Sequence, residues 1–152
     1  MNIDELKQQL YNACQQYVQS RLTAAQEAID AAQQAANEET KSSAGDKYET
    51  GRAMAQLESD RNKAQLNEAN KLKVALNNIP LSQTKEAADA GSVVITSNGK
   101  FYISISAGTL SINNEAYFAV SLASPVGLQL KGKKAGDSFM LNGRNYLIQA
   151  VY

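Results

Sequence analysis

The stretch Ala44-Gly45-Asp46-Lys47-Tyr48-Glu49 separates two long segments that both have helical sequence patterns. Residues 3–79 are rich in Ala, Gln, Glu, Lys and Leu, and they contain no Pro and only two Gly, Gly45 and Gly51. This composition favours long helices, and Gly45 can adopt the positive φ of a tight turn. Two helices of similar length joined by a short polar segment predict an antiparallel coiled-coil hairpin over residues 1–79, with its tip near residues 40–49.

Apolar residues mark one face of each predicted helix. We expect the first helix to end near Glu38, about 50 Å from its start, and its apolar residues recur at spacings of three and four. Many of them are Ala, whose small side chain lets two helices approach closely and buries little area. The second stripe weakens where Asp60, Arg61 and Asn62 interrupt it. The expected stripe residues are Ile3, Leu6, Leu10, Ala13, Tyr17, Val18, Leu22, Ala25, Ile29, Ala32 and Ala36 in the first helix, and Tyr48, Met54, Leu57, Ala64, Leu66, Ala69, Leu72, Val74, Leu76 and Ile79 in the second.

The composition changes near Pro80. Proline disfavours helical geometry in the residue before it, so the second helix is expected to stop at or before Ile79. We interpret residues 80–91 as a linker, and residues 92–152 as a separate domain that holds most of the β-branched and aromatic runs. The fold class is therefore α+β: a long N-terminal helical hairpin followed by a small antiparallel β domain with one short helix.

Turn and cap signals organise the predicted β domain. Asn98-Gly99 and Asn142-Gly143 are typical of tight hairpin turns. Ser124 followed by Pro125 is typical of a helix N-cap and first helical position. The expected strands cover residues 93–96, 101–105, 109–112, 116–120, 138–141 and 146–151.

Composition excludes several kinds of function. The chain has 15 basic and 15 acidic residues and no His, which argues against a strong nucleic-acid binder and excludes His-based catalysis and His-ligated metals. The single Cys14 lies in a helical pattern and is expected to be a buried structural thiol. We expect no signal peptide, no membrane span and a cytoplasmic location. Lys131, Lys133 and Lys134 form a small basic cluster that is either a solvated loop or a docking site for an acidic partner.

Asp46 and Glu49 lie three residues apart at the expected start of the second helix, and this spacing places both on one side of its first turn. Asp-x-x-Glu at a helix start is a variant of the capping box, in which both carboxylates satisfy backbone N–H groups. The alternative is that the pair faces outward and helps to hold Mg²⁺, which prefers carboxylate oxygens and often binds only one or two of them. Two carboxylates at a hairpin tip would then complete a site inside a partner.

Two motifs resemble the bacterial Gre transcript-cleavage factors. Residues 124–137, Ser-Pro-Val-Gly-Leu-Gln-Leu-Lys-Gly-Lys-Lys-Ala-Gly-Asp, resemble the family's S-P-hydrophobic-x-x-A-L-x-G-K-x-x-G-D signature, and a final β-hairpin is expected to follow. Gly45-Asp46-x-x-Glu49 resembles the family's G-D-x-x-E tip. The order of parts is also similar, with a helical hairpin, a linker and a small FKBP-like sheet domain, so that the resemblance covers nearly the whole chain.

This resemblance implies a function and its residues. The β domain would bind RNA polymerase, with Ser124 and Pro125 in the docking loop, and the coiled coil would enter the secondary channel. Asp46 and Glu49 would help to hold a catalytic Mg²⁺ shared with polymerase, which would then cleave backtracked RNA. The protein would be an accessory factor rather than an enzyme, with no catalytic residue of its own, an indirect contact with nascent RNA, no membrane partner and a monomeric state.

The sequence departs from the family directly after the tip. Residues 50–53 are Thr-Gly-Arg-Ala where the family usually has N-A-E-Y, and Lys47 and Tyr48 replace the usual residues between the acids. One alternative is therefore a regulator that binds the secondary channel without stimulating cleavage. Another, of a different class, is a structural coiled-coil adaptor with a β-domain head.

Overall fold

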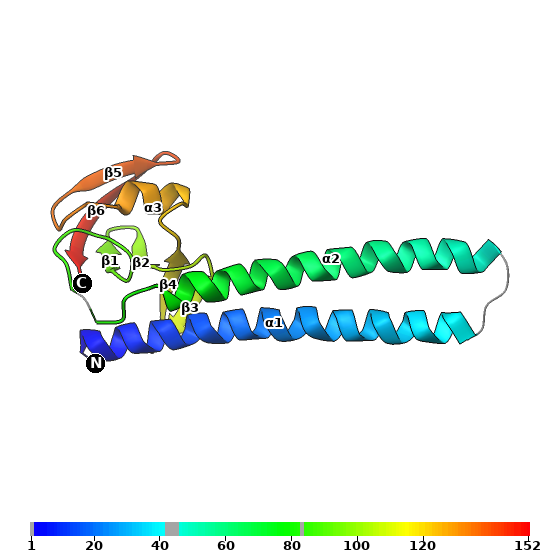
Figure 1. The fold of residues 1–152 in the computed structure, drawn as a ribbon. Coiled ribbons are helices and arrows are strands. Elements are labelled where there is room, and N and C mark those ends of the chain that lie inside the picture. Colours follow the sequence, from blue (N-terminus) through cyan, green and yellow to red (C-terminus); the bar gives the residue numbers. More distant parts are fainter. Residues whose placement is uncertain (1, 42–45, 83) are drawn as a thin grey trace. The chain divides into compact units, whose positions relative to one another are not determined.

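The computed structural model of the protein describes residues 2–41, 46–82 and 84–152, and for residues 39–41 and 46–50 it describes the backbone alone. Two long helices, α1 (Ile3–Lys41) and α2 (Asp46–Asn77), precede a sheet and a short helix, α3 (Pro125–Leu130) (Figure 1). This order of elements confirms the predicted α+β class. The strands are β1 (Val93–Thr96), β2 (Gly99–Ile103), β3 (Gly108–Ile112), β4 (Glu115–Val120), β5 (Ser138–Leu141) and β6 (Arg144–Val151).

The chain divides into two compact units. The sheet unit combines Met1–Tyr17 with Val74–Tyr152, so it contains the first turns of α1, the last turn of α2 and every strand described above. The helix-pair unit is Val18–Lys73, which covers the remaining parts of α1 and α2.

The helix boundaries follow local chemistry. The side-chain oxygen of Asn2 accepts a hydrogen bond of 2.8 Å from the backbone N–H of Glu5, which satisfies one of the free donors at the start of α1. The same helix ends at Lys41 rather than near Glu38, because the intervening residues include no Gly or Pro to stop it. The other long helix, α2, begins at Asp46 and ends at Asn77, close to its predicted limits.

In the helix-pair unit the two helices run antiparallel (Figure 1). Among the residues whose side chains are described, small ones form much of the buried side of this pair. The predicted stripe of α2 was partly wrong. Met54 and Leu57 are each 65 % exposed, whereas Asn62, which the sequence pattern treated as an interruption, is only 7 % exposed. Among residues 51–73 of α2, the less exposed ones are Gly51, Ala55, Ser59, Asn62, Leu66, Ala69 and Leu72, at spacings of three and four.

Hydrogen bonds between side chains four residues apart follow the exposed surface of the long helices. In α1, the amides of Gln19, Gln26 and Gln33 donate to Thr23, Asp30 and Asn37 at 3.1–3.3 Å, so the pattern repeats every seven residues. Such pairs each stabilise a helix by about 0.2–0.5 kcal/mol. The helices thus gain part of their stability locally, without a partner.

The six strands form one sheet in the order β3-β4-β2-β1-β6-β5. Neighbouring strands are antiparallel except β2 and β4, which pair in parallel with Phe101 beside Phe118. The predicted turn at Asn142-Gly143 adopts positive φ at both residues, as a two-residue hairpin of this kind requires. Asn113-Asn114 makes a further turn of this kind, between β3 and β4.

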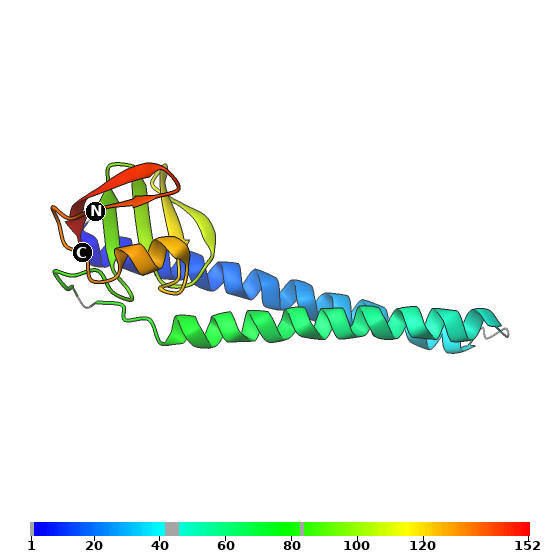
Figure 2. The same cartoon turned by 90° about the horizontal axis from the view of Figure 1, so that it is seen from above.

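One face of the sheet packs against α3, as Figure 2 shows. Leu130 of α3 is fully buried in a cluster with residues of β1, β2 and β6, and Phe139 of β5 and Ala88 of the segment before β1 complete it. The rings of Phe139 and Tyr146 stack with their centroids 4.9 Å apart. This cluster fixes the position of α3 on the sheet. Its buried members are Ala88, Val94, Phe101, Ile103, Leu130, Phe139 and Ile148.

The opposite face of the sheet packs against the first turns of α1. Successive residues of a strand point to opposite faces, so Tyr102 points away from the cluster that contains Ile103. The Cys14 thiol lies 3.5 Å from the hydroxyl of Ser104, and burial raises the pKa of this thiol. Cys14 is fully buried, which confirms its predicted place in a core.

Candidate functional site

Asp46 and Glu49, the proposed metal-directed pair, belong to the first turn of α2, because that helix begins at Asp46. Their side chains lie outside the described residues, as does the backbone of residues 42–45. The helical backbone keeps the expected spacing of one turn between the two residues. Capping and metal binding both remain compatible with this position.

Ser124 and Pro125, the proposed docking pair, start α3 as predicted. Ser124 has extended geometry (φ −71°, ψ 159°), and its hydroxyl accepts a hydrogen bond of 3.0 Å from the backbone N–H of Gly127. The same hydroxyl donates to the carbonyl oxygen of Ser121 at 2.7 Å. Pro125 occupies the first helical position and is exposed. The hydroxyl is therefore engaged locally, while the proline ring is open to a partner.

Gly127 is a structural requirement that sequence reasoning missed. A Cβ atom at this position would collide with the carbonyl oxygen of Ser121 and would lie 2.9 Å from the Oγ atom of Ser124. The hydrogen bonds that cap α3 thus leave room only for glycine. The available signal was a glycine inside a predicted helix, where its poor propensity demands a packing reason.

The turn after α3 accounts for the second half of the motif at residues 124–137. Gly132 and Gly136 have φ of +80° and +95°, which favours glycine at both positions. The carboxylate of Asp137 accepts a hydrogen bond of 2.8 Å from the backbone N–H of Lys134. The Gly-x-x-x-Gly-Asp part of the motif therefore shapes the connection between α3 and β5.

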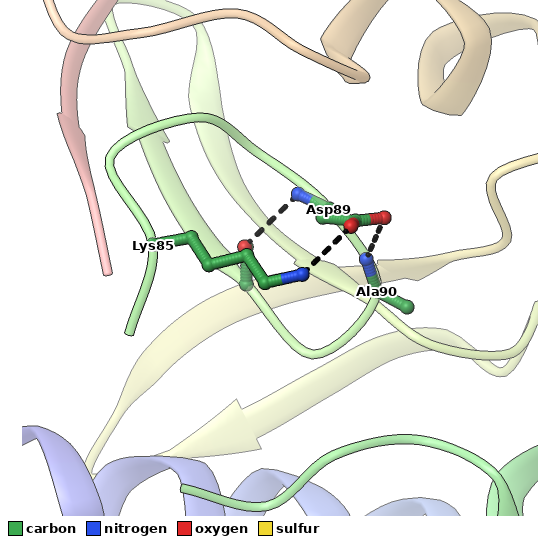
Figure 3. A network of polar contacts seen from close by, with 4 residues as sticks. Lys85, Asp89 and Ala90 are labelled. Carbon is green, nitrogen blue, oxygen red and sulfur yellow. Dashed lines mark hydrogen bonds and ion pairs between the residues drawn. The ribbon is translucent and has the colours of Figure 1, made fainter. Parts of the chain in front are cut away.

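The segment before β1 is tied to this connection. The N–H and C=O groups of Ala88 bond to the backbone of Lys133 and Gly132, both at 2.8 Å. Figure 3 shows Asp89, whose carboxylate accepts from the N–H of Ala90 at 2.8 Å and pairs with the Lys85 ammonium at 3.1 Å. The bond from Ala90, followed by that from Lys85, lowers the pKa of Asp89. A polar network thus anchors residues 85–90 beside α3.

Pro125 and Leu128 of α3 and Lys131 at its C-cap have exposed side chains, and we call these three residues the α3 surface. Leu128 is 65 % exposed although its neighbour Leu130 is fully buried. Residues three apart on a helix lie on one side, so the proline ring and the leucine face solvent together, and the exposed Lys131 follows at the C-cap of α3. An apolar centre with an adjacent cation suits a protein partner that offers an apolar pocket and a carboxylate.

Within the described part of the chain, no group of three or more His, Cys, Asp or Glu side chains could hold a metal ion. The side chains of Asp46 and Glu49 lie outside the residues to which this statement applies. The described helices also include none that is long and apolar enough to cross a membrane.

No protein-family model matches the chain, and a search of curated proteins gave no match.

Proposed function

We propose that the protein is an RNA polymerase-binding transcription elongation factor of the Gre type. In this proposal the helical hairpin enters the secondary channel, and its tip stimulates cleavage of backtracked RNA by the polymerase. The observation that carries the proposal is that each of the two motifs lies at the start of a helix. The G-D-x-x-E motif reaches the first turn of α2, and the S-P motif builds α3 and the connection that follows it.

Asp46 and Glu49 supply the chemistry in this proposal. Their carboxylates would complete the coordination of a Mg²⁺ ion that polymerase also holds. The ion would activate a water molecule and stabilise the charge that develops during phosphodiester hydrolysis. The protein itself would contribute only these ligands and their placement, so it would act as an accessory factor in the polymerase active site.

The α3 surface, together with Ser124, supplies the docking site. Ser124 holds the start of α3 through its two hydrogen bonds, and Pro125 and Leu128 offer exposed apolar area beside Lys131. In the proposed complex this surface binds polymerase, and contact with RNA is indirect. The protein would act in the cytoplasm as a monomer.

The test uses stalled, backtracked polymerase complexes with Mg²⁺. Purified protein is expected to accelerate RNA cleavage, and the double variant Asp46→Asn with Glu49→Gln is expected to lose this acceleration while it still co-purifies with polymerase core. The matched control, Glu58→Gln with Asp60→Asn, makes the same chemical changes farther along α2 at exposed positions and should retain full activity. Absence of acceleration by the unmodified protein would refute the cleavage function.

A second candidate, binding without cleavage, is favoured by one observation. Residues 50–53 differ from the usual continuation of the family's tip. For this candidate the protein co-purifies with polymerase and alters transcription, yet cleavage stays at its unassisted rate. Failure to co-purify would exclude both candidates and favour a coiled-coil adaptor unrelated to transcription.

A further inference from the structure

Asn62 is a buried polar residue in the middle of the helix-pair unit. It is only 7 % exposed, and its Nδ2 atom donates a hydrogen bond of 3.3 Å to the backbone carbonyl oxygen of Ala28 in α1. The two residues are 34 positions apart in the sequence, so the bond links the two helices directly. Burying an amide side chain is unfavourable unless it finds such a partner.

Small residues continue the buried side of the helix pair from Asn62 toward the end of α1 and the start of α2. On α2 the less exposed residues of this stretch are Ser59, Ala55 and Gly51. On α1 they are Ala32 and Ala36, which follow Ile29. None of these five has a side chain large enough to lock into a hole of the facing helix. The contact there lacks knobs-into-holes packing, and we call it a smooth contact.

A smooth contact does not specify how far one helix has slid along the other. In coiled coils, large knobs fit holes at one register only, and a single buried Asn can select a register at some expense of stability. Asn62 has this character, because sliding by one turn would move its amide about 5 Å from the Ala28 carbonyl oxygen. The nearest carbonyl oxygen of α1 would then belong to a residue four positions from Ala28, turned by about 40° around the helix axis, so the buried amide would have a poorly aligned acceptor.

We propose that Asn62 fixes the register of α1 and α2 and is thereby a positioning residue for the start of α2. Asp46 lies about 24 Å along α2 from Asn62, and a helix transmits an axial shift over that length with little loss. The consequence for Asp46 and Glu49 rests on the proposed function. The register itself does not depend on it.

The test measures the register directly. Spin labels are placed on cysteines at the exposed positions Gln34 of α1 and Lys73 of α2, in a Cys14→Ala background, and the distance between them is measured by pulsed electron resonance. Because Asn62 lies opposite Ala28, these two positions are about 25 Å apart along the helix axes, so a slide changes the distance between them. Asn62→Ala removes the amide and extends the contact between small side chains, and Asn62→Leu keeps the branched shape of the side chain without its hydrogen bond. The matched control is Asn67→Leu at an exposed position of the same helix.

We expect one distance in the parent and in Asn67→Leu, and an additional distance in both Asn62 variants, shifted by about 4 Å because most of a one-turn slide lies along the line that joins the two labels. A single, unchanged distance in the Asn62 variants would overturn the proposal. A second distance in the Asn67 control as well would also overturn it, because added apolar surface would then suffice. Loss of helical circular dichroism in both Asn62 variants would mean that the residue is needed for pairing itself, which likewise contradicts a register role.

A second readout separates this inference from the proposed function. In the cleavage assay, stimulation by the unlabelled Asn62 variants should fall in proportion to the fraction of molecules with the shifted distance. Full stimulation despite a shifted register would overturn the positioning role. If the unmodified protein does not stimulate cleavage, the proposed function fails, and the distance measurement still decides the register.

Discussion

The sheet unit and the helix-pair unit bury different kinds of side chain. In the sheet unit, large residues are excluded from solvent almost completely, including Tyr102, Ile103, Leu130 and Ile148. Among the described residues of the helix-pair unit, the buried ones are Val18, Ala25, Asn62 and Ala69. One unit therefore has a core of large apolar side chains, and the other has a narrow seam of small ones with an amide.

The difference shows how each unit is stabilised. Each square ångström of buried apolar area contributes about 25 cal/mol, so the larger side chains of the sheet unit contribute more per residue. The helix-pair unit relies to a greater extent on helix propensity and on the local bonds of Gln19, Gln26 and Gln33. Regions with few buried apolar contacts open at lower free energy than the global core. The proposed functional residues Asp46 and Glu49 thus belong to the helices of the less densely packed unit.

Truncation of Leu130 tests the sheet unit and has the largest expected effect. Leu130→Ala should lower the free energy of unfolding by about 3 kcal/mol, because it removes a fully buried side chain and leaves a cavity. Leu128→Ala, the matched control, should change it by less than about 0.5 kcal/mol, since Leu128 is 65 % exposed. Chemical denaturation followed by tyrosine fluorescence reports this unit, because every tyrosine except Tyr48 belongs to it. Equal losses in both variants would contradict the contrast.

Enlargement of Ala25 tests the helix-pair unit. Ala25 is 4 % exposed, so Ala25→Leu should lower the free energy of unfolding by about 2 kcal/mol through overpacking of the narrow seam. The same substitution at the adjacent, exposed Ala24 should be nearly neutral. Thermal unfolding followed by circular dichroism at 222 nm measures both. If Ala25→Leu instead stabilises the helices, the seam has spare volume, and the close packing inferred for it is wrong.

Local sequence chemistry predicted the sheet unit better than the seam. The β-branched runs, Asn142-Gly143 and Ser124-Pro125 each have one favourable local structure, and each adopts it. The parallel pairing of β2 with β4 was not predictable in this way, because it depends on contacts between segments that are separated in sequence.

The error in α2 has a related cause. Met54 and Leu57 are apolar and were assigned to the buried stripe, yet the stripe is formed by Ala, Ser, Gly and Asn62 as well as Leu66 and Leu72. The alanine-rich α1 lets the two helices approach closely, so small residues of α2 fit between them. Small residues of mixed polarity give little hydrophobic periodicity in the sequence.

For the candidate site, the cap formed by Ser124 and Pro125 was predictable from two residue types. The glycine at position 127 required knowledge of where the carbonyl of Ser121 points.

Two tyrosines on the α1 side of the sheet unit provide the last and smallest test, with opposite expected signs. The hydroxyl of Tyr11 donates to the carbonyl oxygen of Leu76 at 3.1 Å, so Tyr11→Phe should destabilise the sheet unit by about 1 kcal/mol. The hydroxyl of Tyr102 is buried and has no hydrogen-bond partner among the described residues, and burial raises its pKa. Removing a buried hydroxyl of this kind relieves its desolvation penalty, so Tyr102→Phe should stabilise the unit by about 1 kcal/mol.

Chemical denaturation followed by circular dichroism compares these variants without depending on tyrosine emission. Tyr11 and Tyr102 sharpen the contrast between the two units, because each unit contains a buried polar group close to a helix. In the helix-pair unit the amide of Asn62 has a partner in the facing helix, whereas in the sheet unit the large apolar core compensates for a hydroxyl that has none. A loss of stability in Tyr102→Phe similar to that in Tyr11→Phe would show that the Tyr102 hydroxyl makes a stabilising interaction, and the sheet unit would then follow the same rule as the helix pair.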